Sequence, residues 1–158
     1  MEPNIHQFLE PTQCVYWDNA KLVSSAPMKE LFELIDTYAD ESHLRRYLLK
    51  CRECGQLYFF EFYEWIDWEH GNDPQYSKYI PVSTIDDAEM LKNASPGELL
   101  RFSPSLNIDF PKDAEAATIY WAGKLSSRPL PAPAPDAALS SAVGETEKKS
   151  LWRRLFSR

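Results

Sequence analysis

The sequence predicts an α+β protein in which a small antiparallel sheet is flanked by helices. Two of the observations behind this prediction are patterns: runs of aromatic and aliphatic residues at strand spacing between residues 44 and 82, and helical spacing of apolar residues on either side of them. The third is composition, because 44% hydrophobic and 13% aromatic residues are enough to build a packed core in a chain of 158 residues.

The first expected element is a helix over residues 27–39. Pro27 suits the first turn of a helix, with Ser25 or Ala26 before it as the cap. Apolar residues then recur at helical spacing, at Met28, Leu31, Leu34, Ile35 and Tyr38.

The sheet follows, with strands expected at about 44–50, 56–68 and 76–82. A tight turn, Cys51-Arg52-Glu53-Cys54-Gly55, separates the first two strands, and its glycine can supply a positive φ. Pro81 cannot donate a backbone hydrogen bond, so it limits the third strand to an edge or an end. The first two strands are therefore predicted to form a hairpin with a thiol-bearing turn.

Helical signals return after the sheet. Thr84-x-x-Asp87 and Ser95-Pro96-Gly97-Glu98 resemble capping boxes, in which side chains at a helix start bond the exposed backbone N–H groups. A short strand is expected at 106–110. A final helix is expected at 113–124 on the strength of its apolar residues, Ala116, Ala117, Ile119, Tyr120 and Trp121.

Composition divides the chain into three parts. Residues 1–125 are expected to form the folded domain, and residues 126–146 a disordered or semi-stiff Pro/Ala-rich linker. Residues 147–158 form a basic tail with helical spacing, which is too short to be stable alone in water. Its expected anchors to a membrane surface, a partner groove or the domain itself are Leu151, Trp152, Leu155 and Phe156.

The charge distribution indicates the kind of partner, and the apolar stretches indicate the location. The net charge is −7, with −11 on residues 1–146 and +4 on the basic tail. An acidic domain disfavours nucleic acid and favours a basic protein partner. The sequence also has no apolar stretch long enough to span a membrane and no basic start followed by an apolar run, so we expect a cytoplasmic protein.

The cysteine turn is the clearest chemical signal. Cys51 and Cys54 have the spacing that lets two sulfurs face one metal ion, and the backbone N–H groups of such a turn can bond the thiolates. The ten residues from Leu49 to Tyr58 resemble one knuckle of the zinc-ribbon family, which implies a bound zinc ion. The sequence departs from that family because it has no second cysteine pair.

The remaining ligands of such a zinc ion would have to come from elsewhere. Cys14 is the natural third ligand, and His6, which comes from a separate segment, is a candidate for the fourth. His43 and His70 lie at the far ends of the two predicted strands. One structural zinc ion is one interpretation, and a remnant knuckle with reduced thiols is another. A redox pair is the third, although a following strand lacks the helix N-terminus that activates such cysteines.

A second candidate site is the acidic, aromatic strand after the turn. In a regular strand one face would carry the residues expected to contact a basic partner, namely Glu61, Tyr63, Trp65, Asp67 and Glu69. The plainer interpretation is a half-buried strand with one solvated face.

The leading functional hypothesis is a non-enzymatic cytoplasmic protein-binding module. Its size, its acidity and the lack of a recognisable catalytic motif fit the profile of a bacterial toxin-neutralising, immunity-type protein that holds a basic partner. Two alternatives stay open. One is a membrane-surface adaptor recruited by the basic tail, and the other is an enzyme that uses the cysteines or the acidic strand face.

Overall fold

The structure, a computed structural model, describes residues 4–125. The chain divides into two units, Met1–Ser127 and Arg128–Arg158, and only the first contains described residues. The linker at 126–146 and the basic tail with Leu151, Trp152, Leu155 and Phe156 lie outside the described part.

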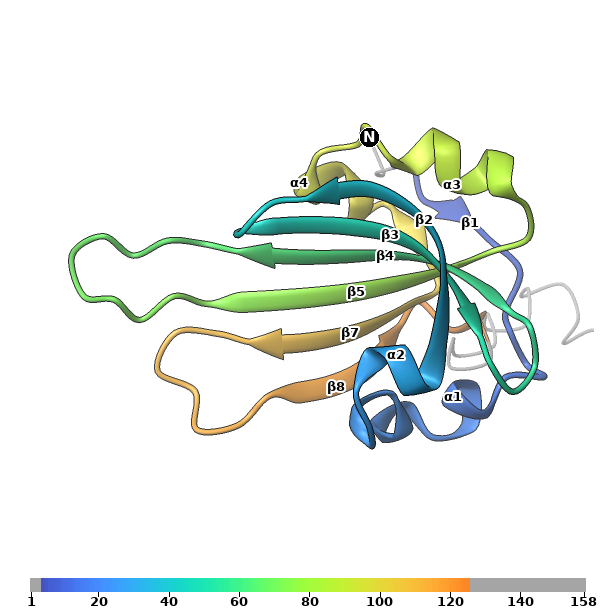
Figure 1. Cartoon of the computed structure of the whole chain (residues 1–158), viewed down its shortest axis with the longest axis horizontal. Coiled ribbons are helices and arrows are strands. Elements are labelled where there is room, and N and C mark those ends of the chain that lie inside the picture. The colour runs from blue at the N-terminus through green and yellow to red at the C-terminus, as the bar shows by residue number, and fades with distance from the viewer. Residues whose placement is uncertain (1–3, 126–158) are drawn as a thin grey trace, which may run out of the picture. The chain divides into compact units, whose positions relative to one another are not determined.

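A six-stranded antiparallel sheet forms the centre of the domain, in the order β2-β3-β4-β5-β7-β8 (Figure 1). A second, two-stranded parallel sheet pairs β1 with β6. The strands are β1 (His6–Gln7), β2 (Phe32–Asp40), β3 (Leu44–Cys51), β4 (Leu57–Glu64), β5 (Gln75–Val82), β6 (Phe102–Ser103), β7 (Ser105–Phe110) and β8 (Thr118–Ala122). The helices are α1 (Val15–Asp18), the 3-10 helix η1 (Ala20–Ser24), α2 (Met28–Leu31), α3 (Ile85–Leu91) and α4 (Pro96–Leu99).

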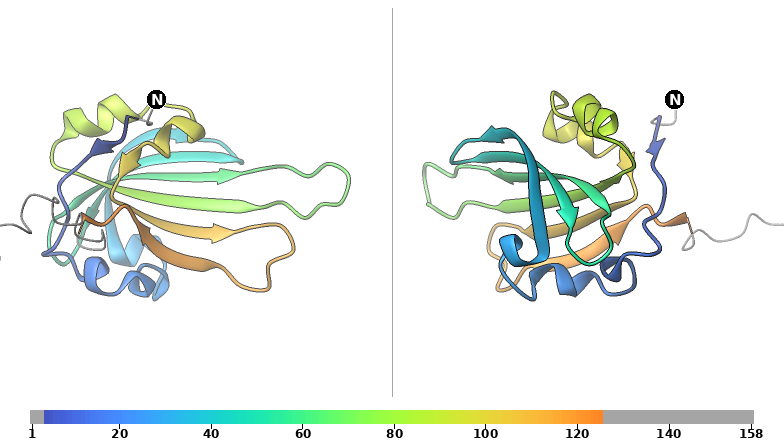
Figure 2. Two further views of the ribbon diagram at one scale, coloured as in Figure 1. Left: turned by 180° about the vertical axis from the view of Figure 1, so that it is seen from behind. Right: turned by 45° about the vertical axis from the view of Figure 1, so that its right-hand side comes forward.

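Helices cover both faces of the large sheet, and each face has its own core (Figure 2). On the first face, here called the cysteine face, α1, η1 and α2 pack on a set of buried side chains that includes Cys51, Tyr58 and Phe60. On the opposite face, called the α3/α4 face, the two later helices pack on Leu48, Phe59 and neighbouring residues. Strand β4 therefore buries alternate side chains on both sides.

The α+β class and several expected elements are confirmed. Strands occur where residues 44–50, 76–82 and 106–110 predicted them. Both expected capping boxes are formed, with Thr84 and Asp87 at the start of α3 and Ser95 and Glu98 at the start of α4. Pro81 lies beyond the last residue of β5 that pairs with β7, which agrees with its predicted place at a strand end.

The predicted helix over 27–39 is wrong beyond its first turn. Only Met28–Leu31 is helical, and the chain continues as the edge strand β2. The register against β3 skips Ile35 and Tyr38, so each is an extra residue in a bulge. Each bulge shifts the two-residue alternation by one. In a strand with two bulges, the apolar residues can therefore be three or four positions apart. This is the same spacing that an amphipathic helix shows, which explains the wrong prediction.

The predicted final helix over 113–124 is also wrong, because strand β8 occupies part of that range. Ile119 and Trp121 pack on the core of the cysteine face, while Tyr120 points to the other side, as strand alternation requires. The run Thr118-Ile119-Tyr120-Trp121 consists of β-branched and aromatic residues, and its pairing with β7 outweighs the helical spacing.

The strand expected at 56–68 ends earlier than predicted. β4 pairs with β5 as far as Glu64 and Gln75, after which residues 65–74 form a loop. This loop, called the β4–β5 loop, extends beyond the sheet as the long green hairpin in Figure 1. No helix among residues 4–125 is both long and apolar enough to cross a membrane.

Candidate metal centre

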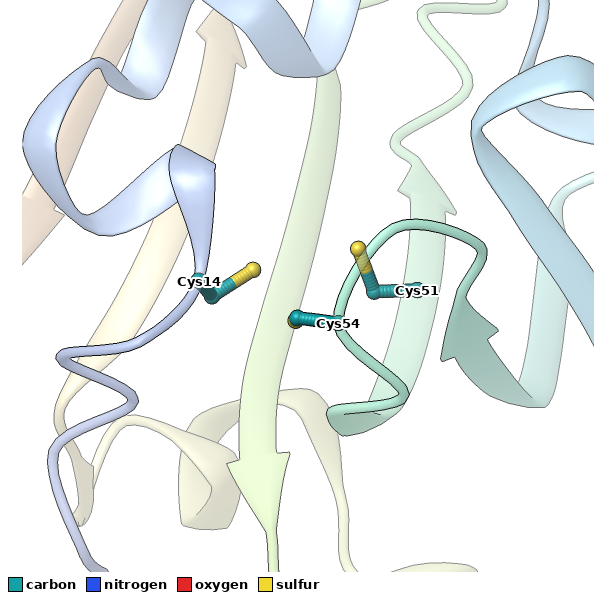
Figure 3. A group of neighbouring side chains, drawn as sticks. All are labelled: Cys14, Cys51 and Cys54. Carbon is teal, nitrogen blue, oxygen red and sulfur yellow. The ribbon is translucent and has the colours of Figure 1, made fainter.

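Three cysteines from two distant segments meet on the cysteine face. The sulfur atoms of Cys14, Cys51 and Cys54 all lie within 4.8 Å of one another (Figure 3). Cys14 and Cys51 are buried, whereas Cys54 lies at the surface, and none of the three forms a disulfide. The position of Cys14 beside the two cysteines of the turn therefore agrees with the expectation from the sequence.

Cys14 is held at the start of α1. Its backbone N–H donates to the carbonyl of Pro11 at 2.9 Å, and its own carbonyl accepts from Trp17 at 2.9 Å. Its backbone is extended, as is usual for the residue before a helix. This local geometry directs the thiol toward the β3–β4 turn.

Cys51 and Cys54 are placed by that turn. The N–H of Cys51 donates to the carbonyl of Gln56 at 2.8 Å, and the N–H of Gly55 donates to the carbonyl of Cys51 at 2.9 Å. Gly55 has φ of +79°, a conformation that side chains with a Cβ rarely adopt. The glycine predicted to close the knuckle is therefore required by the backbone.

Burial decides the protonation of the Cys14 thiol. Desolvation raises the pKa of Cys14 to about 12, although the neighbouring Tyr58 hydroxyl acts in the opposite direction. Burial also raises the pKa of Tyr16, and the nearby Cys51 raises it further. At neutral pH the metal-free Cys14 is consequently a neutral thiol, and a bound cation would have to displace its proton.

The Tyr58 hydroxyl is a further polar group at this site, and no pattern in the sequence indicated it. Tyr58 is 1% exposed, and its hydroxyl has no hydrogen-bond partner of ordinary geometry. Burial raises its pKa, and the next causes are the thiols of Cys14, Cys54 and Cys51. A buried hydroxyl without a firm partner costs free energy, so its position beside three thiols points to a group that these side chains would share.

The donor set suits a soft metal ion. Thiolates favour Zn²⁺, Cu⁺ and iron–sulfur clusters over Mg²⁺ or Ca²⁺. In a tetrahedral zinc site with Zn–S bonds of about 2.3 Å, neighbouring sulfurs are about 3.8 Å apart. The sulfurs, which lie within 4.8 Å of one another, would therefore close by no more than about 1 Å.

The histidines lie away from this cluster. Among residues 4–125 the group of close metal-ligating side chains contains three cysteines and no histidine. His6 lies on β1, where its ring stacks on Phe102 with 4.9 Å between ring centroids. His43 bonds Glu64 at the opposite end of the β3–β4 hairpin. The assignment of His6 as the fourth ligand stays a prediction.

The five residues expected to contact a partner do not share one strand face. Glu61 is 4% exposed and accepts two hydrogen bonds from Arg46, at 2.9 and 2.5 Å. Tyr63 is half-buried further along β4. Trp65, Asp67 and Glu69 belong to the β4–β5 loop. The early end of β4 separates the two groups.

The β4–β5 loop exposes two large aromatic rings. Trp65 is 62% exposed and Trp68 is 89% exposed. Asp67 folds the loop by accepting backbone bonds from Glu69 and His70, and it accepts a 2.8 Å bond from Lys112 in the β7–β8 loop. The Lys112 contact and these hydrogen bonds hold the pKa of Asp67 below its usual range, so this carboxylate is charged at neutral pH.

Comparisons with protein families, with curated proteins and with solved structures find no match to this chain. The resemblance to a zinc ribbon therefore extends only to the cysteine turn between two strands. What is established is a group of three close cysteines that could hold a metal ion.

Proposed function

We propose that this protein is a non-enzymatic module that binds a basic protein partner, and that one structural zinc ion stabilises its fold. The observation that supports the binding role is the pair of exposed tryptophans, Trp65 and Trp68, in an acidic loop that extends beyond the sheet. Exposed aromatic rings are typical anchors of protein interfaces.

The zinc ion would join two segments that are distant in the sequence. Cys14 belongs to the N-terminal segment, and Cys51 and Cys54 belong to the β3–β4 turn. Crosslinking these segments through a metal stabilises the folded state because the unfolded chain has no preformed site. The Tyr58 hydroxyl supports the proposal, since it can donate to a thiolate sulfur or bind the ion directly.

Metal analysis of protein purified without chelator tests the zinc site. We expect about one zinc per chain, and on cobalt substitution a thiolate-to-cobalt charge-transfer band. Cys54→Ser is the informative variant, because its surface position should leave the fold intact while weakening the site. Zinc-free protein with three reduced thiols, counted after the protein is denatured, would contradict the proposal and favour the remnant knuckle.

Electrostatics favour a basic partner for the β4–β5 loop. Asp67, Glu69 and Asp73 lie in this loop, and residues 4–125 carry 20 acidic against 11 basic side chains. A negative field speeds the encounter with a positive partner, and the tryptophans would supply the apolar contact once the two meet. The reducing cytoplasm expected from the sequence would keep the thiols available for metal.

An array of Lys/Arg-rich and Asp/Glu-rich peptides tests the partner chemistry directly. We expect salt-sensitive retention on the basic peptides, and loss of that retention in the double variant Trp65→Ala/Trp68→Ala. Met90→Ala is the matched control, because Met90 is also an exposed apolar side chain, 55% accessible on α3. Equal binding to both peptide classes, or an equal effect of the control, would refute the proposed surface.

The membrane-adaptor alternative depends on the basic tail, which lies outside the described residues. It stays a prediction, to be tested by sedimentation with anionic liposomes. The full chain should sediment more than a variant that ends at residue 125 if the tail recruits the protein to membranes.

A further inference from the structure

A pocket of about 340 Å³ opens on the α3/α4 face, on the side of the sheet opposite the cysteines. Strands β4, β5, β7 and β8 form its floor, and Pro96, Gly97 and Leu100 form one side. This volume lies at the small end of the range for ligand sites in proteins. The pocket can therefore hold a molecule of roughly amino-acid size.

A row of polar residues crosses the sheet beneath the pocket. Arg46, Glu61, Lys78, Asn107 and Tyr120 are consecutive cross-strand partners on β3, β4, β5, β7 and β8. Glu61 and Asn107 are each 4% exposed, so polar groups replace the apolar core at this point of the sheet. Such a row costs folding free energy, which suggests a role other than stability.

Lys78 retains hydrogen-bonding capacity in this row. Its ammonium group has three donors, and one of them bonds Asn107 Oδ1 at 2.6 Å. Among the described residues it has no other hydrogen-bond partner, and desolvation lowers its pKa while Asp109 and Glu61 oppose that shift. Two N–H groups are thus left for an acceptor in the pocket.

Carboxylates and aromatic rings complete the lining. Asp109 accepts a 2.7 Å bond from the Tyr120 hydroxyl through Oδ2, which leaves its other oxygen for a donor in the pocket. Tyr63 and Tyr76 face each other across β4 and β5, and with Tyr120 they give the pocket three aromatic rings. The pocket therefore contains a cation, carboxylates and apolar surface in one small volume.

The charged side chains in the pocket determine which kind of ligand can bind there. A purely cationic molecule would meet the Lys78 ammonium, and a purely anionic molecule would meet the carboxylates of Asp109 and Glu61. A small zwitterion satisfies both kinds of group at once. We propose that this pocket binds a free amino acid, with its carboxylate on Lys78, its ammonium group on Asp109 and an apolar or aromatic side chain against the tyrosines.

Titration of the full chain with one ligand and its two truncated analogues tests this proposal. The probes are L-phenylalanine, phenethylamine, which lacks the carboxylate, and 3-phenylpropionate, which lacks the ammonium group. We expect saturable calorimetric binding of the amino acid, and at least about tenfold weaker binding of each analogue, because each loses a charge-assisted contact. This comparison uses unaltered protein and does not depend on any variant folding.

Two variants locate the site. Lys78→Met should abolish the preference for the amino acid over phenethylamine, and Asp109→Asn should abolish the preference over 3-phenylpropionate. Lys29→Met is the matched control, because Lys29 is an exposed lysine on α2, and it should bind like the unaltered protein. The proposal is overturned if several natural amino acids fail to bind at millimolar concentration, if an analogue binds as tightly as the amino acid, or if both pocket variants bind normally.

Discussion

Two neighbouring arginines on β3 offer a sharp test of the packing on the α3/α4 face. Arg46 and Glu61 form a buried pair whose side chains are 6% and 5% exposed. Arg46 also donates to the carbonyl of Lys92 at the end of α3, at 2.7 Å. Arg46→Met keeps much of the side-chain volume but leaves both the Glu61 carboxylate and this carbonyl without their partner.

The structure sets the expected size of the effect. Removing one partner of a buried ion pair destabilises a protein by about 3–5 kcal/mol, because the other charge stays buried. Arg45→Met is the matched control. Arg45 is 50% exposed, and its Nε lies 3.7 Å from a carboxylate oxygen of Asp40, so its loss should cost about 0–1 kcal/mol. Urea unfolding followed by circular dichroism measures both changes in the free energy of unfolding.

The pH dependence gives an independent check. Burial raises the pKa of Glu61 even though Arg46 opposes the shift, so loss of Arg46 should raise that pKa further. A raised carboxyl pKa means that protonation favours the folded state, an advantage that is lost as the pH rises through the folded-state pKa. The deficit of Arg46→Met should therefore be smaller at pH 5 than at pH 7. A deficit at pH 7 no larger than that of Arg45→Met would refute the reasoning.

Three further predictions follow from local geometry. Gly55→Ala should destabilise the protein by about 1–2 kcal/mol and weaken zinc binding, whereas Gly97→Ala, in open space on α4, should be neutral or stabilising in thermal unfolding. Thr84→Ala and Ser95→Ala should each cost about 1 kcal/mol through the lost capping box, as measured by urea unfolding. The raised pKa of Cys14 makes metal-free protein lose stability as the pH rises from 9 toward 12, and zinc affinity should increase between pH 6 and 8 with proton release in calorimetry.

Elements defined by nearby residues could be predicted from the sequence. The capping boxes at Thr84 and Ser95 each involve side chains three residues apart, and the β3–β4 hairpin closes within a short turn. In these cases the interactions that form the element join residues that are close together in the sequence. Gly55 was recognised for the same reason, because the turn itself demands its positive φ.

Elements that depend on pairing with distant strands could not be predicted in this way. The apolar spacing of residues 27–39 fits a helix, and only the pairing with β3 reveals the bulges at Ile35 and Tyr38 that produce that spacing in a strand. The segment 113–124 became a strand because β7 offers an unpaired edge to residues 118–122. Strand pairing contributes hydrogen bonds and side-chain contacts that no local propensity contains.

The candidate sites also combine features set by nearby residues with features set by distant parts of the chain. The sequence by itself determined the cysteine knuckle, the acidic composition and the aromatic residues that follow the turn, because these are properties of neighbouring residues. Only the tertiary structure decided that Cys14 and the Tyr58 hydroxyl join the knuckle, that Glu61 is buried against Arg46, and that Lys78 and Asp109 line one pocket. The physical reason is that burial and charge pairing depend on which strands and helices lie against one another, and chain neighbours alone do not specify that arrangement.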